Sequence, residues 1–243
     1  MLFRSLVRAA GCVSCHTDSK NQGQAFAGGR GLKTPFGTYY APNITPDVET
    51  GIGSWSDGDF LAAVKRGLRP DGSHYFPVFP YTTYTRMRDG DALAIKAYLF
   101  SLTPVRKQVR EHDVWPPFSR RWPLLFWKWL YFDEGDFVPD ANQDDEWNRG
   151  AYLVNALVHC GECHTPRNAL GGKKTNMTLA GTTEGPVGGL IPNITPDKKT
   201  GIGRWPDADL KELFQSGMLP DGDFVGSDMG EVVDHGTSKM SNA

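Results

Sequence analysis

Short amphipathic segments alternate with long stretches rich in glycine and proline along this chain of 243 residues. Residues 57–66 place their apolar side chains on one face of a helix, which ends at the stop signal Gly67. Residues 89–101 repeat apolar positions at helical spacing until Pro104 closes the segment. We therefore expect a mainly α fold with small protein cores and long loops. The other predicted helices cover residues 2–10, 152–158 and 206–216.

The sequence also repeats itself. The phrase N-I-T-P-D at residues 43–47 returns 150 positions later at 193–197. The phrase T-G-I-G-x-W at residues 50–55 returns with the same shift at 200–205. This interval is far longer than the roughly 20–50 residues of a solenoid repeat, so it indicates a duplicated domain. We expect a first domain over residues 1–104, a connector over 105–146 and a second domain over 147–243.

The connector is unusually aromatic, since four of the seven tryptophans lie between positions 115 and 129. Spanning a bilayer takes roughly 20 apolar residues, so this stretch is too short for a transmembrane helix. One interpretation is a strap that packs across both domains, because aromatic segments usually contribute to cores. The other is an exposed docking or quinone-facing surface.

Charge and common enzyme motifs narrow the function further. The formal net charge is −2, with acids and bases mixed along the chain, so nothing indicates a nucleic-acid partner. No Ser-His-Asp set, P-loop or dinucleotide-binding glycine motif stands out in the sequence. The chemistry must therefore come from the cysteine motifs.

All four cysteines lie in two copies of C-x-x-C-H, the attachment site of a c-type haem. Two thiols at this spacing can add to the two vinyl groups of one porphyrin, and the adjacent imidazole then lies beneath the iron. Zinc would need both pairs in one cluster, and a thioredoxin-like pair would need a βαβ unit that the surroundings lack. We therefore predict two covalently attached haem c groups. The residues predicted to bind them are Cys12, Cys15, His16, Cys160, Cys163 and His164.

Each electron-transfer haem also needs a distal ligand opposite the histidine, and a methionine there raises the potential. For the first haem, Met87 lies 71 residues after the histidine of the first motif. His74 is the competitor and would give a bis-histidine haem of lower potential. For the second haem, Met229 lies in a glycine-bounded loop over 226–230, whereas Met240 repeats the Thr-Arg-Met context of Met87 as Ser-Lys-Met. The residue pattern leaves both pairs of alternatives open.

Together these residues resemble the dihaem and trihaem cytochrome c subunits of periplasmic dehydrogenases, such as the alcohol, gluconate and aldehyde dehydrogenase cytochrome c subunits. The resemblance extends over nearly the whole chain. It rests on both C-x-x-C-H motifs, on the repeated phrases, and on the segments 79–82, 132–135 and 163–168. It implies two tandem class I cytochrome c-type domains joined by the aromatic-rich connector.

The chain departs from this family pattern at Phe79. Many of the similar alcohol dehydrogenase cytochromes have a methionine ligand there, and phenylalanine cannot bind iron, so the resemblance makes Met87 the replacement candidate. Met229 follows Phe79 by 150 residues and opens the family-like segment M-G-E-V-V, which favours Met229 over Met240. No third C-x-x-C-H is present in the sequence. The metal ligands that we expect are His16, Met87, His164 and Met229.

The resemblance implies a non-catalytic electron-transfer subunit. It would accept electrons from the catalytic subunit of a periplasmic dehydrogenase of flavin, quinoprotein or molybdenum type. It would pass them to a quinone, an oxidase or a soluble cytochrome. The alternative is a dihaem c-type enzyme, peroxidase-like or thiosulfate-oxidising, with one labile distal site. A high-spin ferric component would favour that alternative.

Periplasmic location follows from the same resemblance, either soluble or peripherally attached to the inner membrane. No signal peptide precedes Cys12, and the second repeat stops before a counterpart of the helix at 89–101. We therefore expect the sequence to be cut short at both ends.

Overall fold

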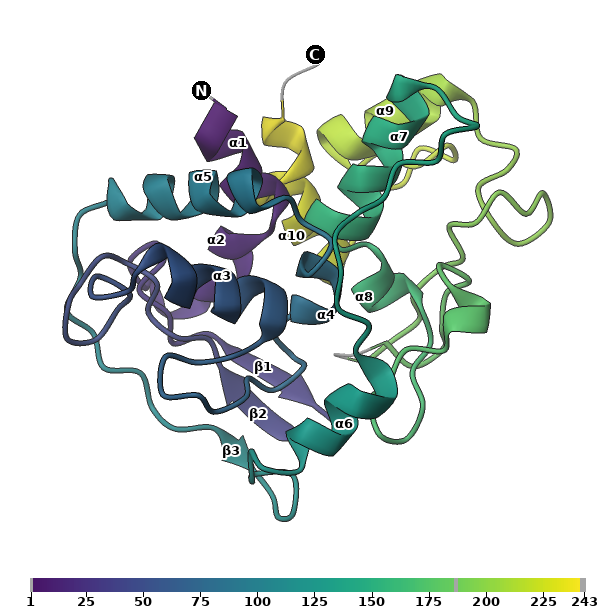
Figure 1. The fold of residues 1–243 in the computed structure, drawn as a ribbon. Coiled ribbons are helices and arrows are strands. Elements are labelled where there is room, and N and C mark those ends of the chain that lie inside the picture. The colour runs from purple at the N-terminus through teal and green to yellow at the C-terminus, as the bar shows by residue number, and fades with distance from the viewer. Residues whose placement is uncertain (1, 186–187, 241–243) are drawn as a thin grey trace.

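The computed structural model describes residues 2–185 and 188–240 and consists of helices, long loops and one small sheet. The first repeat (purple to blue) and the second repeat (green to yellow) lie on opposite sides of the molecule in Figure 1. Residues 241–243, where the sequence predicts the early end of the second repeat, lie outside the described residues. The helices are α1 (Leu2–Ala9), α2 (Cys12–His16), η1 (Ser19–Asn21), α3 (Asp57–Arg66), α4 (Tyr81–Tyr84), α5 (Asp89–Phe100), α6 (Leu124–Tyr131), α7 (Asp145–Tyr152), η2 (Leu153–Leu157), α8 (Gly161–His164), η3 (Thr175–Met177), α9 (Asp207–Ser216), α10 (Ser227–His235) and η4 (Thr237–Lys239), and the strands are β1 (Gly31–Thr34), β2 (Gly37–Tyr40) and β3 (Asp113–Val114).

The long helices match the periodicity of the sequence. Helix α3 begins with a capping box, in which the Ser56 side chain accepts from the Asp59 amide and the Asp59 carboxylate accepts from the Ser56 amide. It ends at Gly67, whose φ of 56° is the left-handed conformation of a helix C-terminus. Helix α5 carries Asp89 and Asp91 in its first turn, where they face the positive end of the helix dipole. The helices predicted over 57–66 and 89–101 are thus confirmed, the second ending one residue early.

Three features differ from the sequence expectation. The antiparallel sheet β1-β2-β3 is not predicted, because each strand has at most four residues and β3 comes from the distant connector. The helix expected over 152–158 divides into the end of α7 and the π-helical turn η2. The expectation of a glycine-bounded loop around Met229 is wrong, because residues 227–235 form α10, which buries Val233. The described residues thus form a mixed fold, in which helices predominate over one small sheet, and the two tandem domains with their boundaries remain a prediction.

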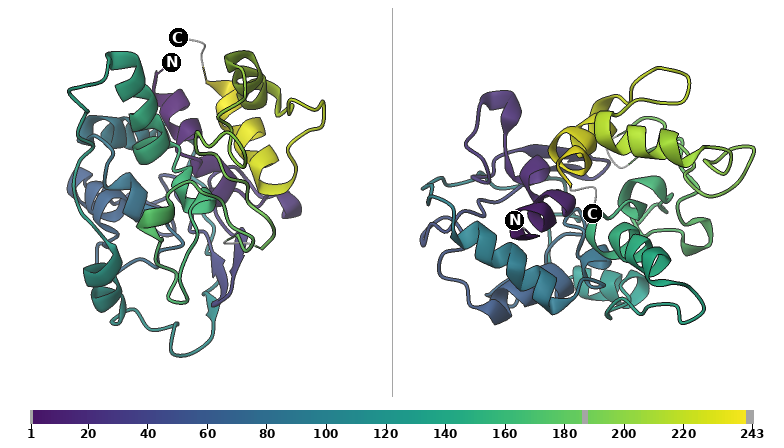
Figure 2. Two further views of the ribbon diagram at one scale, coloured as in Figure 1. Left: turned by 90° about the vertical axis from the view of Figure 1, so that its right-hand side faces the viewer. Right: turned by 90° about the horizontal axis from the view of Figure 1, so that it is seen from above.

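The main hydrophobic cluster joins the two repeats. In the first repeat, Leu6 and Val7 of α1 pack with Ile95 and Leu99 of α5. Leu157 of η2, from the second repeat, belongs to the same cluster. The C-terminal segment of the second repeat (yellow) lies against the N-terminal helices (purple) in Figure 1 and Figure 2, where η4 contacts α1 and α10 contacts α2. Burying each side chain of this size contributes about 1.5–3 kcal/mol, so this shared core holds the two repeats together.

The repeated phrases adopt the same local structure. In the first repeat the Asn43 side chain accepts from the Thr45 amide at 3.0 Å, and in the second Asn193 accepts from Thr195 at 2.8 Å. The next turn is also repeated, with the carboxylates of Asp47 and Asp197 each accepting a 2.7 Å hydrogen bond from the amide three residues later. The sequence repeat is therefore a repeat of backbone conformation.

In the connector helix α6, a lysine faces the protein interior while large apolar side chains face solvent. Lys128 is only 8 % exposed, and its ammonium group donates to the Gly67 carbonyl at 3.0 Å and lies 4.7 Å from the ring centre of Tyr81. Burial lowers the pKa of Lys128 to about 8. On the opposite side Trp129 is 82 % exposed. No helix within residues 2–185 and 188–240 has the length and apolar character needed to cross a membrane.

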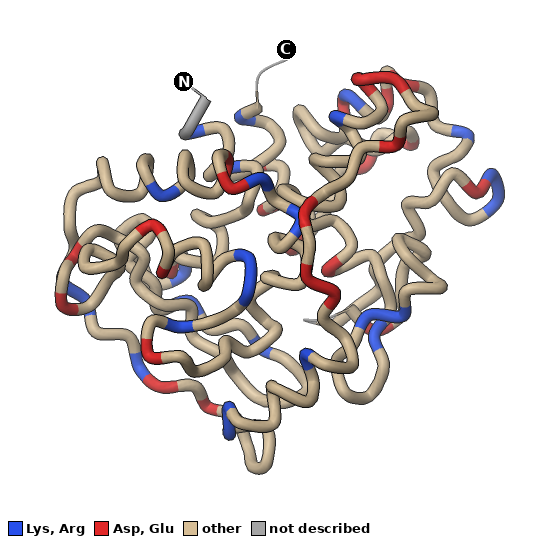
Figure 3. Tube along the Cα trace, in the orientation of Figure 1, with Lys and Arg blue, Asp and Glu red and all other residues tan. Residues whose placement is uncertain are grey.

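Lys and Arg residues alternate with Asp and Glu residues along the chain trace, as Figure 3 shows. Several of them form ion pairs between segments that are distant in sequence, such as Arg66 with Glu134 at 3.1 Å. Exposed pairs of this kind contribute little free energy.

A glycine turn holds the loop after each C-x-x-C-H motif against the proline phrase. The amide of Gly28 donates to the His16 carbonyl, and the amide of Gly181 donates to the His164 carbonyl, both at 2.8 Å. Both glycines have positive φ, 69° and 77°. A Cβ on Gly28 would lie 2.5 Å from the carbonyl carbon of Pro42, closer than any side chain can approach. Only glycine fits this position without moving the backbone.

We expect Gly28→Ala to lower the free energy of unfolding by at least about 2 kcal/mol, because left-handed backbone and backbone overlap add. Gly72→Ala is the matched control, since Gly72 has a φ of 79° with no atom within 4 Å of an added Cβ. The control should lose only about 1 kcal/mol. Denaturant unfolding of both variants measures the difference, and equal losses would contradict the close approach at Gly28.

Candidate haem-attachment sites

The histidines of the two motifs are held in the same way. The ring Nδ1 of His16 lies 2.7 Å from the carbonyl oxygen of Pro42, and that of His164 lies 2.8 Å from the carbonyl oxygen of Pro192. A carbonyl can only accept, so Nδ1 carries the proton and the lone pair is left on Nε2. Burial lowers the pKa of both imidazoles, with the hydrogen bond opposing it, which favours the neutral form that a metal needs.

The cysteines lie on short helices, Cys12 and Cys15 on α2 and Cys163 on α8, with Cys160 at the start of α8. All four are free thiols of intermediate exposure. Burial raises the pKa of Cys12 to about 12 and that of Cys163 to about 11, so both thiols are protonated at neutral pH. The described residues contain no group of three or more His, Cys, Asp or Glu side chains arranged to hold a metal ion. These facts argue against a thiolate zinc cluster.

The two motifs approach each other at the junction of the repeats. The Ala10 carbonyl, just before the first motif, accepts a hydrogen bond from the Tyr84 hydroxyl, and the side chain of His159, which directly precedes the second motif, lies close to Ala10 and Gly11. The rings of Tyr84 and His159 meet edge to face with centres 5.6 Å apart. A negative charge on Cys15 would raise the pKa of Cys163, so the two sulfur atoms are close enough to interact electrostatically. Two cofactors attached at these motifs would therefore be neighbours.

The candidate ligands for the first haem lie in different environments. Met87 is fully buried and belongs to the main cluster, against which Cys12 and Val13 of the first motif pack. His74 is not part of that cluster. Its Nδ1 is buried without a hydrogen-bond partner, and burial followed by the nearby Lys128 charge lowers the pKa of its ring. Met87 is therefore packed in the cluster that borders the first motif.

The candidates for the second haem are also separated. Met229 lies in α10 and is partly buried. Met240 packs against the main cluster, which is built mostly from the first repeat. Helix α10 contacts α9 of its own repeat and also α2, the helix of the first motif. Met229 therefore lies on an element that borders both repeats.

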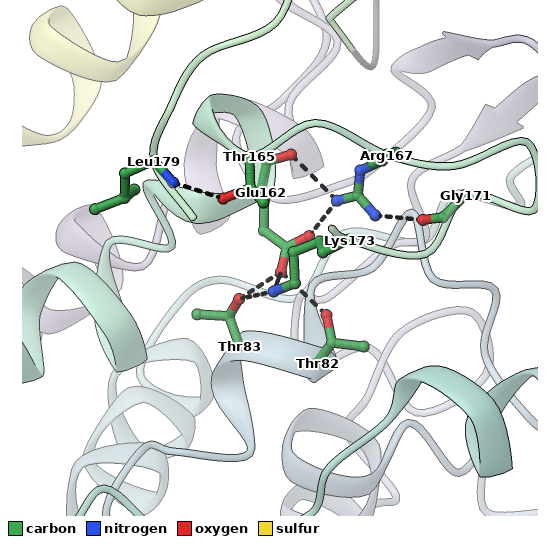
Figure 4. Close-up of polar contacts among 8 residues, drawn as sticks. All are labelled: Thr82, Thr83, Glu162, Thr165, Arg167, Gly171, Lys173 and Leu179. Atoms are coloured by element: carbon green, nitrogen blue, oxygen red, sulfur yellow. Dashed lines mark hydrogen bonds and ion pairs between the residues drawn. The ribbon is translucent and has the colours of Figure 1, made fainter. Parts of the chain in front are cut away.

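Glu162, the third residue of the second motif, forms a buried ionic cluster that the sequence analysis missed (Figure 4). It is only 8 % exposed. Its Oε1 accepts from Lys173 at 2.8 Å and from Thr82 at 3.0 Å, as well as from Thr83. Its Oε2 pairs with Arg167. Burial alone would raise the pKa of Glu162, but the two cations and these hydrogen bonds lower it to about 2.

A second ionic contact joins the first motif to the second repeat. Arg30 donates to the backbone carbonyl of Ser14 at 2.7 Å and pairs with Glu231 of α10. Ser14 is the third residue of the first motif, the position of Glu162 in the second. A charged residue inside C-x-x-C-H was the one sequence signal for the Glu162 cluster. Its partners Thr82 and Thr83 lie about 80 residues away, so no local pattern could indicate them.

These residues fit two c-type haems. Each motif offers two protonated thiols at the required spacing and an imidazole whose Nε2 is free because Nδ1 is occupied by a carbonyl. A structural zinc site would need the four sulfurs as thiolates in one cluster, which the described residues do not form. The donor set is therefore that of covalent haem attachment.

Comparison with known proteins leads to the same cofactor. No protein-family model matches the chain. The chain is 42 % identical over 233 residues to a dihaem cytochrome c-type protein of Cereibacter sphaeroides, covering 93 % of this chain and 75 % of that protein. It is 38 % identical to the gluconate 2-dehydrogenase cytochrome c subunit of Pantoea cypripedii and to the fructose dehydrogenase cytochrome subunit of Gluconobacter japonicus. Each of these two matches covers 98 % of this chain.

The chain spans 55 % of the gluconate dehydrogenase cytochrome and 49 % of the fructose dehydrogenase cytochrome. It spans most of the Cereibacter protein, and the identity to that protein extends over nearly all of this chain. Together with the two C-x-x-C-H motifs and their matching histidine contacts, this assigns the family. The chain therefore belongs to the dihaem c-type cytochromes.

Proposed function

We propose that the chain is the electron-transfer component of a periplasmic dehydrogenase system. Two cytochrome c-type domains, residues 1–104 and 147–243 joined by 105–146, would each hold one haem c through a C-x-x-C-H motif. The haem irons supply the one-electron redox chemistry. The observation that carries the proposal is the contact between the two motifs through Ala10, Tyr84 and His159, because electrons pass readily only between close centres.

The proposed distal ligands are Met87 for the first haem and Met229 for the second. Met87 is supported by its complete burial in the cluster against which Cys12 packs. Met229 is supported by its place in α10, which contacts α9 of the second repeat. Met240, by contrast, packs against the main hydrophobic cluster, which is built mostly from the first repeat. His/Met coordination would give both haems a higher potential than bis-histidine coordination.

The partner would be the catalytic subunit of a dehydrogenase of flavin, quinoprotein or molybdenum type. Relatives named as cytochrome subunits of gluconate and fructose dehydrogenases support this class of partner. Electrons would then leave to a quinone, an oxidase or a soluble cytochrome. A peroxidase-like enzyme needs a distal site that small substrates can reach, and the burial of Met87 favours electron transfer instead.

Purification of the haem-loaded protein from its native host tests the function. We expect two haems per chain, a low-spin ferric spectrum and a co-purifying catalytic subunit. Addition of the substrate of that subunit should reduce both haems within the turnover time. Peroxide turnover by the cytochrome alone, with a high-spin ferric component and no partner, would contradict the proposal.

The distal ligand of the first haem is tested with Met87→His and Met87→Ala. We expect Met87→Ala to make one haem high-spin and to halve the near-infrared band of methionine ligation, at a cost in stability of about 2–5 kcal/mol. Met87→His should keep one low-spin haem at a lower potential. Met177→Ala is the control, because Met177 is exposed on η3. An unchanged spectrum in Met87→Ala would exclude Met87.

Peripheral attachment to an anionic membrane surface is proposed through the outer side of α6. Leu125, Phe126, Trp129 and Leu130 are all more than half exposed, although the helix is anchored from behind by Lys128. Tryptophan and leucine side chains favour the membrane interface. Residues 114–132 contain no acidic residue and, besides the buried Lys128, the basic residues Arg120 and Arg121, which suits anionic headgroups.

The double variant Phe126→Ser/Trp129→Ser should lose most of its binding to vesicles that contain anionic lipid. The wild-type protein should co-sediment with these vesicles and bind neutral vesicles less well. The control Val138→Ser changes an exposed apolar residue outside α6. Absence of wild-type binding to either vesicle, or equal binding by the double variant, would contradict attachment through α6.

A further inference from the structure

We propose that Glu162 tunes the potential of the second haem, because it holds a buried negative charge inside the attachment motif that keeps this potential below the value it would have without the carboxylate. The inference rests on the proposed function, because it assumes that a haem is attached at each motif. It concerns a residue of the motif that neither binds the porphyrin nor coordinates iron. Its basis is the placement of charge around the two motifs.

The two motifs differ at their third residue. The first motif has Ser14, whose backbone carbonyl accepts from Arg30 at 2.7 Å. The second has Glu162, with its carboxylate enclosed by protein. Both positions lie one residue before a haem-binding cysteine, so a charge there is close to the porphyrin attached at that cysteine. The duplicated units are therefore electrostatically unequal at equivalent positions.

The Glu162 carboxylate cannot turn away from the motif. Thr82 and Thr83 of α4, from the first repeat, both donate to it, and Lys173 donates to Glu162 and to Thr83 at 3.2 Å. Arg167 pairs with the other carboxylate oxygen and also donates to the Glu162 carbonyl at 3.1 Å. The charge is therefore fixed in position and shielded from solvent.

The sign of the effect follows from the charge of the iron. A ferric haem carries one more positive charge than a ferrous haem, so a nearby carboxylate stabilises the ferric state and lowers the potential. Arg167 and Lys173 act in the opposite direction and together exceed the single negative charge. Removal of the Glu162 charge alone would leave both cations unopposed. The potential of the second haem should then rise.

The first motif has a more balanced environment. Arg30 is paired with Glu231, so the local charges cancel. Asp228 of the same helix lies near both motifs. The asymmetry therefore depends on Glu162 with Arg167 and Lys173. Because these groups are buried or half-buried, salt screens them weakly.

The test is a spectroelectrochemical titration of the haem-loaded Glu162→Gln variant beside the wild-type protein. We expect the potential of one haem to shift upward and the other to move much less, with the same shift at high salt. Lys173→Gln removes a cation from the same cluster and should shift the same haem downward. Glu162→Asp keeps the charge and should restore a potential close to that of the wild type.

The matched control is Glu231→Gln, which removes a carboxylate from the ion pair beside the first motif. It should raise the potential of the other haem, with a shift that high salt reduces, since Glu231 is partly exposed. Unchanged potentials in Glu162→Gln, or equal shifts of both haems, would overturn the inference. A correlation between haem potential and unfolding temperature across the Gln and Asp variants would also overturn the inference, because a purely structural role of Glu162 predicts that correlation.

Failure of the proposed function would look different. If wild-type protein showed two haem potentials but accepted electrons from no dehydrogenase, the partner assignment would be wrong while the effect of Glu162 could still be measured. If Glu162→Gln did not retain its second haem, Lys173→Gln and Glu162→Asp would still decide the sign and origin of the shift. A wild-type protein with a single haem potential would contradict the asymmetry itself.

Discussion

The hydrogen bond from each motif histidine to a proline carbonyl is the contact on which the rest of the structure depends. It orients the imidazole and leaves Nε2 free for a metal, at 2.7 Å in the first repeat and 2.8 Å in the second. The carbonyl can reach the ring only because the glycine after each motif lets the backbone approach the proline phrase. The asparagine and threonine of that phrase then hold its own turn. This chain of contacts explains why the same phrases occur twice.

The junction between the repeats uses a different kind of contact. Apolar side chains of α1, α5 and η2 form one shared cluster, whereas the motifs themselves are joined by polar groups. Glu162 and Arg30 each connect a motif to the opposite repeat, to α4 and α10 respectively. A buried carboxylate is stable there because it has two cations and two hydroxyl donors. The polar contacts therefore fix how the two motifs face each other, while the apolar cluster supplies most of the free energy of association.

The two sides of helix α6 have different surroundings, one packed against the protein and one exposed to solvent. Its inner side contacts both repeats, since Lys128 caps the end of α3 and the Trp127 indole donates to the Leu170 carbonyl at 2.8 Å. Its outer side exposes a row of apolar side chains. The strap and the exposed surface, which the sequence presented as alternatives, thus describe opposite sides of one helix. A lysine can occupy the inner side because helix-end carbonyls and aromatic faces satisfy its charge.

Local pattern and spacing in the sequence determined the two C-x-x-C-H motifs, the 150-residue repeat and the helices α3 and α5, because each depends on residues a few positions apart. Cys12, His16, Cys160 and His164 could thus be predicted as haem-attachment residues from sequence alone. Tertiary structure decided the β1-β2-β3 sheet, the helical state of the segment around Met229 and the partners of Glu162. These features depend on groups far apart in the chain: β3 pairs with β2 across more than 70 residues, and Thr83 donates to a carboxylate 79 residues away. No sequence period encodes such pairs, because only the packed chain brings the two groups together and excludes water from them.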